Sequence, residues 1–166
     1  MIFVAVGTQL PFDRLVRSID EWAASTPGRD VFAQIANGAY TPQHIEWARN
    51  ILPTEFQARL EGCHLLVAHA GIGSILSALE LGKPVIVLPR QALLGEHRND
   101  HQLATAKRFG ERGMVHVAQD ETDLCRLLDQ FETPVSEMKI SSEASPELIR
   151  NLRQFISQAT CNKRGA

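Results

Sequence analysis

The stretch HLLVAHAGIGSILSALELGKPVIVLPR, residues 64–90, decides the fold of this 166-residue chain. It opens with an apolar run at residues 65–68, which has the length of a buried strand. A loop with two glycines, Gly71 and Gly73, follows this run. The next residue, Ser74, is of a type that caps helix N-termini, so the pattern predicts a strand that leads into a helix.

The second half of the stretch predicts the end of that helix and a second strand. Apolar side chains recur at helical spacing from Ile75 to Leu81. Gly82 can adopt the left-handed conformation that ends a helix, and Pro84 cannot continue one. A second apolar run covers residues 85–88. Strand, glycine loop, helix and strand form a βαβ unit, whose crossover makes the two strands parallel.

The glycine loop at residues 69–73 is a candidate anion-binding site. It follows a predicted parallel strand, where open α/β sheets bind ligands, and it leads to a helix N-terminus, which favours negative charge. Glycine also lets a phosphate approach the backbone without a Cβ in the way. The dinucleotide fingerprint is incomplete, because Leu76 stands at the third glycine position. Two interpretations stay open, a phosphate cradle and a helix-capping turn without a ligand.

Outside this unit, apolar runs of strand length alternate with helical patterns. The further predicted strands cover residues 2–6, 31–36, 45–48 and 114–118, and the further helices cover residues 11–24, 52–62, 100–109, 121–131 and 146–159. This alternation is typical of a single doubly wound, Rossmann-like α/β domain with a mainly parallel sheet. We expect the domain to span residues 1–160, with a polar tail at 161–166.

Composition restricts the class of protein. Hydrophobic residues make up 44% of the chain and charged residues 22%, with a formal net charge of −2. This charge balance argues against nucleic acid as the main partner. No apolar stretch has the length of a membrane span, and no signal peptide is evident. The three cysteines stand far apart and form no metal-ligand pair, so we expect a reduced, cytoplasmic protein.

Both glycine junctions together resemble the carboxyl-terminal, donor-binding half of glycosyltransferase family 28, which is half of a two-domain GT-B architecture. The matching segments are Val6-Gly7-Thr8, His69 to Ser74, Glu80 with Gly82-Lys83-Pro84, and Glu96 to Gln102. The resemblance extends to small single-domain members that form half of a two-chain enzyme. These include the PssE-type exopolysaccharide proteins and the catalytic subunit of the dolichol-pathway N-acetylglucosaminyltransferase.

The resemblance implies a UDP-sugar donor site at the carboxyl ends of the strands. The residues that match the family's site are Gly7, Thr8, His69, Gly71, Ile72, Gly73, Ser74, Glu80, His101 and Gln102. The loop at 71–74 resembles the pyrophosphate contact, and residues 7–8 resemble the glycine loop that faces it. Glu80 matches the acidic residue that accepts hydrogen bonds from the ribose, and residues 101–102 match the pair that binds the donor sugar's hydroxyls.

Each of these residues also has a structural interpretation, which stays open at this point. Ser74 is a natural helix cap. A solvated side chain is one interpretation of Glu80, but a ligand role explains it better, because Glu80 stands late in its helix, where the dipole disfavours a carboxylate. His101 and Gln102 are an ordinary polar helix start. His69 is the candidate catalytic residue, and it is also a candidate for a structural histidine that holds the loop.

Sugar transfer requires stabilisation of the leaving pyrophosphate and a base for the acceptor hydroxyl. Members of this family stabilise the leaving pyrophosphate with amides, a helix dipole and side chains. This chain also has no Asp-x-Asp motif, so we expect no metal or other cofactor. The base commonly comes from the acceptor half, which this chain lacks. We therefore expect the donor-binding catalytic subunit of an inverting transferase that moves a sugar from a UDP-sugar to a lipid-linked saccharide in exopolysaccharide or capsule synthesis.

A membrane-anchored partner would then carry the acceptor domain and hold the chain at the inner face of the membrane. One alternative is a non-catalytic sugar-nucleotide-binding or scaffold subunit that stabilises such a partner. Another is a non-transferase enzyme of the same architecture, such as a sugar-nucleotide epimerase, which would need a second domain to close over the donor. The predicted helix at residues 146–159 either docks the partner or packs on its own domain.

Overall fold

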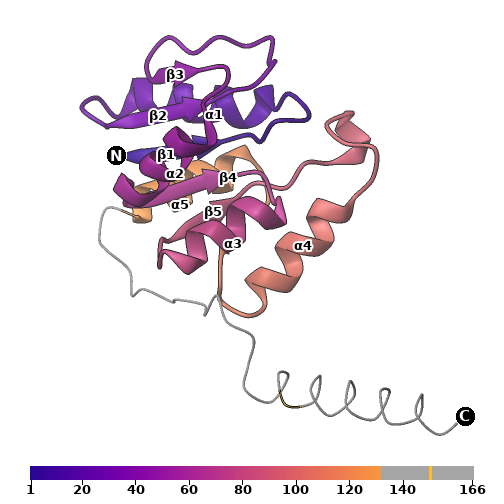
Figure 1. Cartoon of the computed structure of the whole chain (residues 1–166). Coiled ribbons are helices and arrows are strands. Elements are labelled where there is room, and N and C mark those ends of the chain that lie inside the picture. Colours follow the sequence, from indigo (N-terminus) through magenta and orange to yellow (C-terminus); the bar gives the residue numbers. More distant parts are fainter. Residues whose placement is uncertain (132–149, 151–166) are drawn as a thin grey trace, which may run out of the picture.

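The computed structural model describes residues 1–131 together with Arg150. Within them, six strands form one sheet in the order β3-β2-β1-β4-β5-β6, and every neighbouring pair is parallel (Figure 1). Helices cover both faces of the sheet. The prediction of a doubly wound, Rossmann-like α/β domain is confirmed.

The elements agree with the sequence pattern except at their ends. The strands are β1 (Ile2–Ala5), β2 (Val31–Gln34), β3 (Glu46–Ala48), β4 (Leu65–Ala68), β5 (Val85–Val87) and β6 (His116–Val117). The helices are α1 (Asp13–Ser25), α2 (Pro53–Gly62), α3 (Ile72–Glu80), α4 (His101–Gly110) and α5 (Glu121–Gln130), with a 3₁₀ turn η1 (Ala92–Leu94). The predicted helix at 146–159 and the tail at 161–166 lie outside the described residues. Among the described helices, none combines the length and the apolar character that crossing a bilayer requires.

Two hydrophobic cores lie on opposite faces of the sheet. Along β1, Ile2 and Val4 belong to the core under α1 and α5, whereas Phe3 and Ala5 belong to the core under α2, α3 and α4. All four residues of β1 and all four of β4 are buried. Strands covered on both faces have continuous apolar sequences, which is why these runs were recognisable before the structure was known.

The strand order reverses between β1 and β4. The chain moves outward from β1 through β2 to β3 and then returns to place β4 on the other side of β1. Ala5 pairs with Ala68 at the carboxyl ends of these two strands. The loops that follow them therefore leave the sheet side by side, at the position where open α/β sheets bind ligands. The topology brings the two glycine junctions together.

Helix α3 begins earlier than the pattern predicted, and the prediction of Ser74 as its N-cap is wrong. Gly71 is the N-cap residue, with an extended backbone of φ −82° and ψ 127°, and no side chain caps the helix. The N–H of Ile75 donates to the carbonyl oxygen of Gly71 at 3.2 Å. The glycine already turns the chain into the helix, so Ser74 lies inside the first turn.

Candidate functional site

A pocket of about 530 Å³ opens at the carboxyl ends of the central strands, a volume in the range of small-molecule sites. The loops after β1, β4 and β5 and the start of α2 surround it. The predicted donor-site residues that line it are Gly7, Thr8, His69, Gly71, Gly73, Ser74 and Gln102. Residues as far apart in the sequence as Gly7 and Gln102 thus line one cavity.

Three predicted residues lie outside the pocket lining. Ile72 is 55% exposed, and His101 is exposed at the first position of α4. Glu80 is exposed at the last position of α3, about 12 Å along the helix axis from its first residue. Because α3 runs away from the pocket, the structure does not bring Glu80 to it, and the expected ribose contact of Glu80 has no geometric support.

The N-terminus of α3 offers backbone donors to the pocket. The first N–H groups of a helix have no intrahelical acceptor, and the capping residue Gly71 has no side chain to supply one. Gly73 and Ser74, in this first turn, both line the pocket. A Cβ added at Gly73 would meet nothing within 4 Å, so the backbone there is open to an approaching ligand. This end of the pocket is suited to an anion.

The imidazole of His69 lies between the two glycine loops. A Cβ on Gly71 would overlap the imidazole Nε2, and a Cβ on Gly7 would lie 2.7 Å from Cε1. Gly7 also has a φ of +81°, which side chains rarely adopt. Both glycines thus make room for a histidine of the protein itself. The sequence interpretation, in which these glycines make room for a phosphate, did not include this neighbour.

His69 is neutral at physiological pH. Burial, with the positive charge of Arg90 as a second cause, lowers the pKa of His69 to about 4. Its Nδ1 lies 3.4 Å from the carbonyl oxygen of Ala5, at the end of β1. A base with so low a pKa accepts a proton poorly at pH 7. The geometry therefore favours the structural interpretation of His69, as a residue that joins the loops after β1 and β4.

Arg90 is a pocket residue that the sequence interpretation missed. It is only 3% exposed, and its Nη2 donates to the carbonyl oxygens of Val6 at 2.7 Å and Leu10 at 2.6 Å. The side-chain oxygen of Gln102 accepts the backbone N–H of Arg90 at 3.2 Å. A basic residue placed directly after β5 and Pro89, at the carboxyl end of a parallel strand, was the signal that could have identified it.

The opposite end of the pocket is more apolar. Ile51, Pro53 and Phe56, from the segment after β3 and the start of α2, line it together with the amide of Asn50. These residues were not predicted as site residues, because nothing in their local pattern differs from an ordinary helix start. An apolar slot with one amide is suited to a planar heterocycle, whereas the α3 end is suited to an anion.

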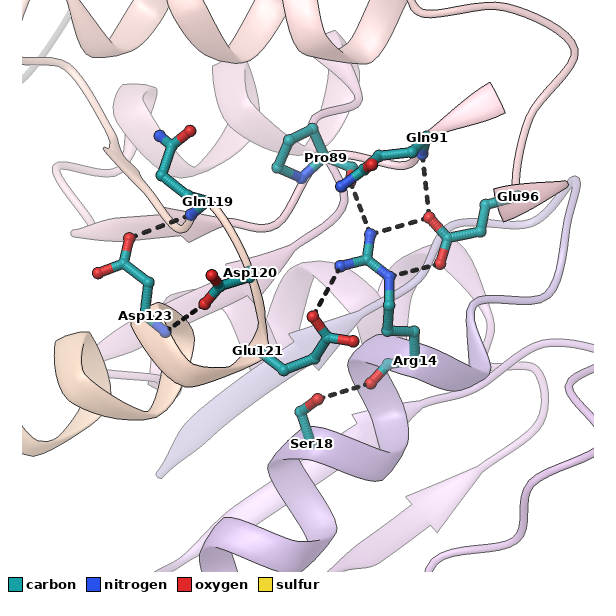
Figure 2. A network of polar contacts seen from close by, with 9 residues as sticks. All are labelled: Arg14, Ser18, Pro89, Gln91, Glu96, Gln119, Asp120, Glu121 and Asp123. Atoms are coloured by element: carbon teal, nitrogen blue, oxygen red, sulfur yellow. Dashed lines mark hydrogen bonds and ion pairs between the residues drawn. The ribbon is translucent and has the colours of Figure 1, made fainter. Parts of the chain in front are cut away.

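An ion pair between Arg14 and Glu96 holds the segment after β5 (Figure 2). This segment carries Arg90 and His97, which line the pocket. Arg14 of α1 binds Glu96 through two hydrogen bonds, Nε to Oε1 at 2.6 Å and Nη2 to Oε2 at 2.8 Å. The same Nη2 donates to the carbonyl oxygen of Pro89 at 3.0 Å, and Glu96 also accepts the N–H of Gln91 at 2.9 Å. Glu96, the first residue of the segment 96–102 that resembles the family, thus anchors this loop to α1.

Among the described residues there is no group of three or more His, Cys, Asp or Glu side chains that could hold a metal ion. The groups that the pocket offers to a ligand are the open amides of α3, the buried Arg90, a neutral His69 and an apolar slot. Together they can bind a molecule that joins a planar ring to a polyanion.

Comparisons with known proteins identify relatives of the chain. The family model for the glycosyltransferase family 28 C-terminal domain matches residues 1–154. The UDP-N-acetylglucosamine transferase subunit ALG13 of Homo sapiens is 29% identical over 137 residues, which are 76% of this chain and 11% of that protein. The protein of the same name from Yarrowia lipolytica is 28% identical over 132 residues, which are 72% of this chain and 65% of that protein. The chain thus spans about a tenth of the human relative and just under two thirds of the yeast relative.

A solved structure shows the same fold. The NMR solution structure of ALG13 superposes with a TM-score of 0.60 at 19% identity and covers 91% of this chain and 94% of that chain. At this level of identity the likeness concerns the arrangement of strands and helices.

Proposed function

The chain belongs to the family of glycosyltransferase family 28 C-terminal domains, and we propose that it is the donor-binding catalytic subunit of a glycosyltransferase that takes its sugar from a UDP-sugar. The observation that carries this proposal is the pocket at the strand ends, with open amides and a buried cation at one end and an apolar slot at the other. The relatives are named UDP-N-acetylglucosamine transferase subunits, so UDP-N-acetylglucosamine is the first donor to test.

The two ends of the pocket suggest how the donor lies. The diphosphate occupies the N-terminus of α3, near Gly73 and Ser74, where backbone donors are free. The uracil occupies the slot of Ile51 and Phe56, with the Asn50 amide available to its polar edge. The sugar then extends toward Gln102, which keeps the role that the resemblance implied for it.

The reaction is an inverting displacement. The acceptor hydroxyl attacks the anomeric carbon, the bond from that carbon to the phosphate oxygen breaks, and UDP leaves with both electrons of that bond. Helix-terminal amides are already oriented toward the charge that develops on the leaving group, so they stabilise it without reorganisation. We assign the proton-accepting base to a second chain, because His69 has a pKa of about 4 and is a poor base at neutral pH.

The second chain supplies the acceptor domain. The word "subunit" in the names of the relatives supports a two-chain enzyme. We propose that the partner is membrane-anchored, that it binds a lipid-linked saccharide, and that it holds this chain at the cytoplasmic face of the membrane. Exopolysaccharide or capsule synthesis is the context that the sequence resemblance supports. We further propose that transfer uses no metal, so an excess of EDTA should leave turnover by the pair unchanged.

Titration calorimetry tests the donor assignment. We expect the chain, alone or co-expressed with its partner, to bind UDP and UDP-N-acetylglucosamine more tightly than GDP and GDP-mannose, which have the same phosphates and a different base. UDP-glucose, UDP-galactose and UDP-glucuronic acid complete the panel and identify the sugar. Failure of both preparations to bind any uridine diphosphate at millimolar concentration would contradict the proposal. Unchanged turnover by the pair after disruption of the pocket would instead indicate a scaffold subunit.

A further inference from the structure

We propose that Arg90 is the fixed cation of the donor site and that its guanidinium pairs with the diphosphate of the bound nucleotide. This inference rests on the proposed function and adds a residue to it. Arg90 lines the pocket from the segment after β5, a different element from the helix whose N-terminus offers amides. The diphosphate would therefore be held from two sides.

The first observation is an incomplete set of hydrogen bonds. Arg90 is 3% exposed, and its Nη2 donates to two backbone carbonyls, those of Val6 and Leu10. Its Nε is buried and has no acceptor among the described residues. A buried N–H without an acceptor costs free energy, so such a group requires an explanation in a folded protein. A ligand that supplies acceptors to this guanidinium is one such explanation.

The second observation is an uncompensated charge. Within the described part of the chain no carboxylate forms an ion pair with Arg90. The acidic group that most affects its pKa, Glu96, is itself bound by both of its oxygens to Arg14. Burial lowers the pKa of Arg90, and the attraction of Glu96 opposes this. A buried cation that has no anion beside it raises the free energy of the folded protein, and a bound polyanion would compensate the charge.

The third observation is the arrangement of the neighbours. The ring of Phe12 lies 5.0 Å from the guanidinium carbon of Arg90, and the carbonyls of Val6 and Leu10 bind its Nη2. These contacts fix the guanidinium in place, and its charge helps to keep His69 neutral. A cation that is already fixed loses little entropy when the anion arrives, and it can stabilise negative charge on the leaving diphosphate.

The experiment compares UDP with uridine, which lacks the phosphates. The variant Arg90→Met removes the charge and retains much of the side chain's length. We expect it to bind UDP about tenfold more weakly or worse, the range of a lost charge-assisted hydrogen bond, and to bind uridine with unchanged affinity. Arg90→Lys should recover part of the UDP affinity. The matched control is Arg98→Met, which removes the same charge from an exposed position in the same loop and should change UDP affinity less than about twofold.

Each outcome has a definite meaning. Equal weakening of UDP and uridine binding by Arg90→Met would indicate a purely structural role and overturn the inference. Unchanged UDP affinity in a folded variant would overturn it too, while the proposed function would stand on the binding of UDP by the unmodified chain. If the unmodified chain and the pair bind no UDP, both proposals fail together.

A second measurement covers the case in which Arg90→Met does not fold. In the unmodified chain, the Nε–H resonance of Arg90 should shift when UDP is added and should stay in place when uridine is added. A resonance that responds to neither ligand, or equally to both, would overturn the inference.

Discussion

Gly71 and Gly73 stand two positions apart, yet they meet different neighbours. A Cβ on Gly71 would overlap the imidazole of His69, whereas a Cβ on Gly73 would meet nothing within 4 Å. Gly71 is therefore needed by the protein, and Gly73 is free to serve a ligand. A substitution at Gly73 can therefore test ligand binding without a clash inside the protein, whereas a substitution at Gly71 would also disturb the fold.

We predict that Gly73→Ala weakens UDP binding without destabilising the fold. Alanine is favoured over glycine in a helix, so the free energy of unfolding should stay the same or rise by up to about 1 kcal/mol in urea denaturation. A methyl group at the site of phosphate approach should weaken UDP binding by about tenfold, or about 1.4 kcal/mol, in calorimetry. The control is Gly62→Ala at the end of α2, where a Cβ also meets nothing within 4 Å and no ligand is proposed. Equal UDP affinities in the two variants would place the diphosphate elsewhere.

We predict that His69 makes the fold less stable as the pH falls from about 6.5 to about 4. Its pKa is about 4 in the folded chain and 6.5 in the reference state, so the unfolded chain binds a proton first and is favoured as the pH falls. The stabilisation is complete above pH 6.5, and about 3 kcal/mol is lost by pH 4. Urea midpoints of the unmodified chain and of His69→Gln, compared across this range, isolate the contribution. Parallel pH profiles of the two proteins would disprove it.

At the scale of elements, the segment from Pro89 to His101 depends on a tether to α1. The side chains of Arg14 and Glu96 are 13% and 12% exposed. Arg14 donates to the carbonyl oxygen of Pro89, and Glu96 accepts the backbone N–H of Gln91 (Figure 2). The Glu96 carboxylate raises the pKa of Arg14, although burial alone would lower it. A partly buried, bidentate pair of this kind fixes the loop more firmly than an exposed ion pair could.

We predict that Glu96→Gln loosens this segment and weakens UDP binding. The loss of a charge-assisted, bidentate contact should lower the free energy of unfolding by about 1–3 kcal/mol. UDP affinity should fall as well, because Arg90 is on this segment and Gln102 follows it directly in α4. The matched control is Glu121→Gln, which removes a more exposed partner of Arg14 at 3.4 Å and should cost less than about 1 kcal/mol. Equal losses in the two variants would show that Glu96 has no special role.

At the scale of the whole molecule, the sheet has a protected centre and open edges. β1 and β4 have a neighbouring strand on each side and lie between the two cores, whereas β3 and β6 are edge strands with exposed residues. The pocket is attached to the protected centre, since the loops after β1 and β4 form its middle. The part of the fold to which the pocket is attached is thus the part that should open least easily.

We predict a matching order of amide hydrogen exchange. Amides of β1 and β4 should exchange only through global unfolding, and those of β3 and β6 should exchange through smaller openings of lower free energy. Saturating UDP should slow exchange at the N-terminus of α3 more than at β3 or β6, because ligand binding stabilises the structure that it contacts. Exchange from β4 at the rate of the edge strands would contradict this order.

The fold was accessible from sequence because its signals are local. The apolar run at 65–68, the two glycines after it and the run at 85–88 lie within one short segment, and their spacing indicates parallel strands joined by a helix. The error in the predicted start of α3 has a local cause as well. A glycine can end one element and begin the next, so Ser74 was not required as the cap.

The candidate site was accessible only in part. The family resemblance implied that Gly7 faces the loop of Gly71 and Gly73, and all three line the pocket at the edge of the sheet that the carboxyl ends of parallel strands share. Only the family resemblance placed Glu80 at the donor, and in the structure Glu80 is at the far end of α3, outside the pocket lining. The apolar slot near Ile51 carried no local signal at all.

The sequence by itself determined the order of strands and helices, the parallel sheet and the location of the glycine loops, since each follows from the periodicity of neighbouring residues. Only the tertiary structure decided that His69 fills the space between Gly7 and Gly71, that Glu96 binds Arg14, and that Arg90 is buried without an ion-pair partner among the described residues. Burial and charge pairing depend on side chains that are distant in the chain, so their energetics exist only once the sheet has brought those side chains together.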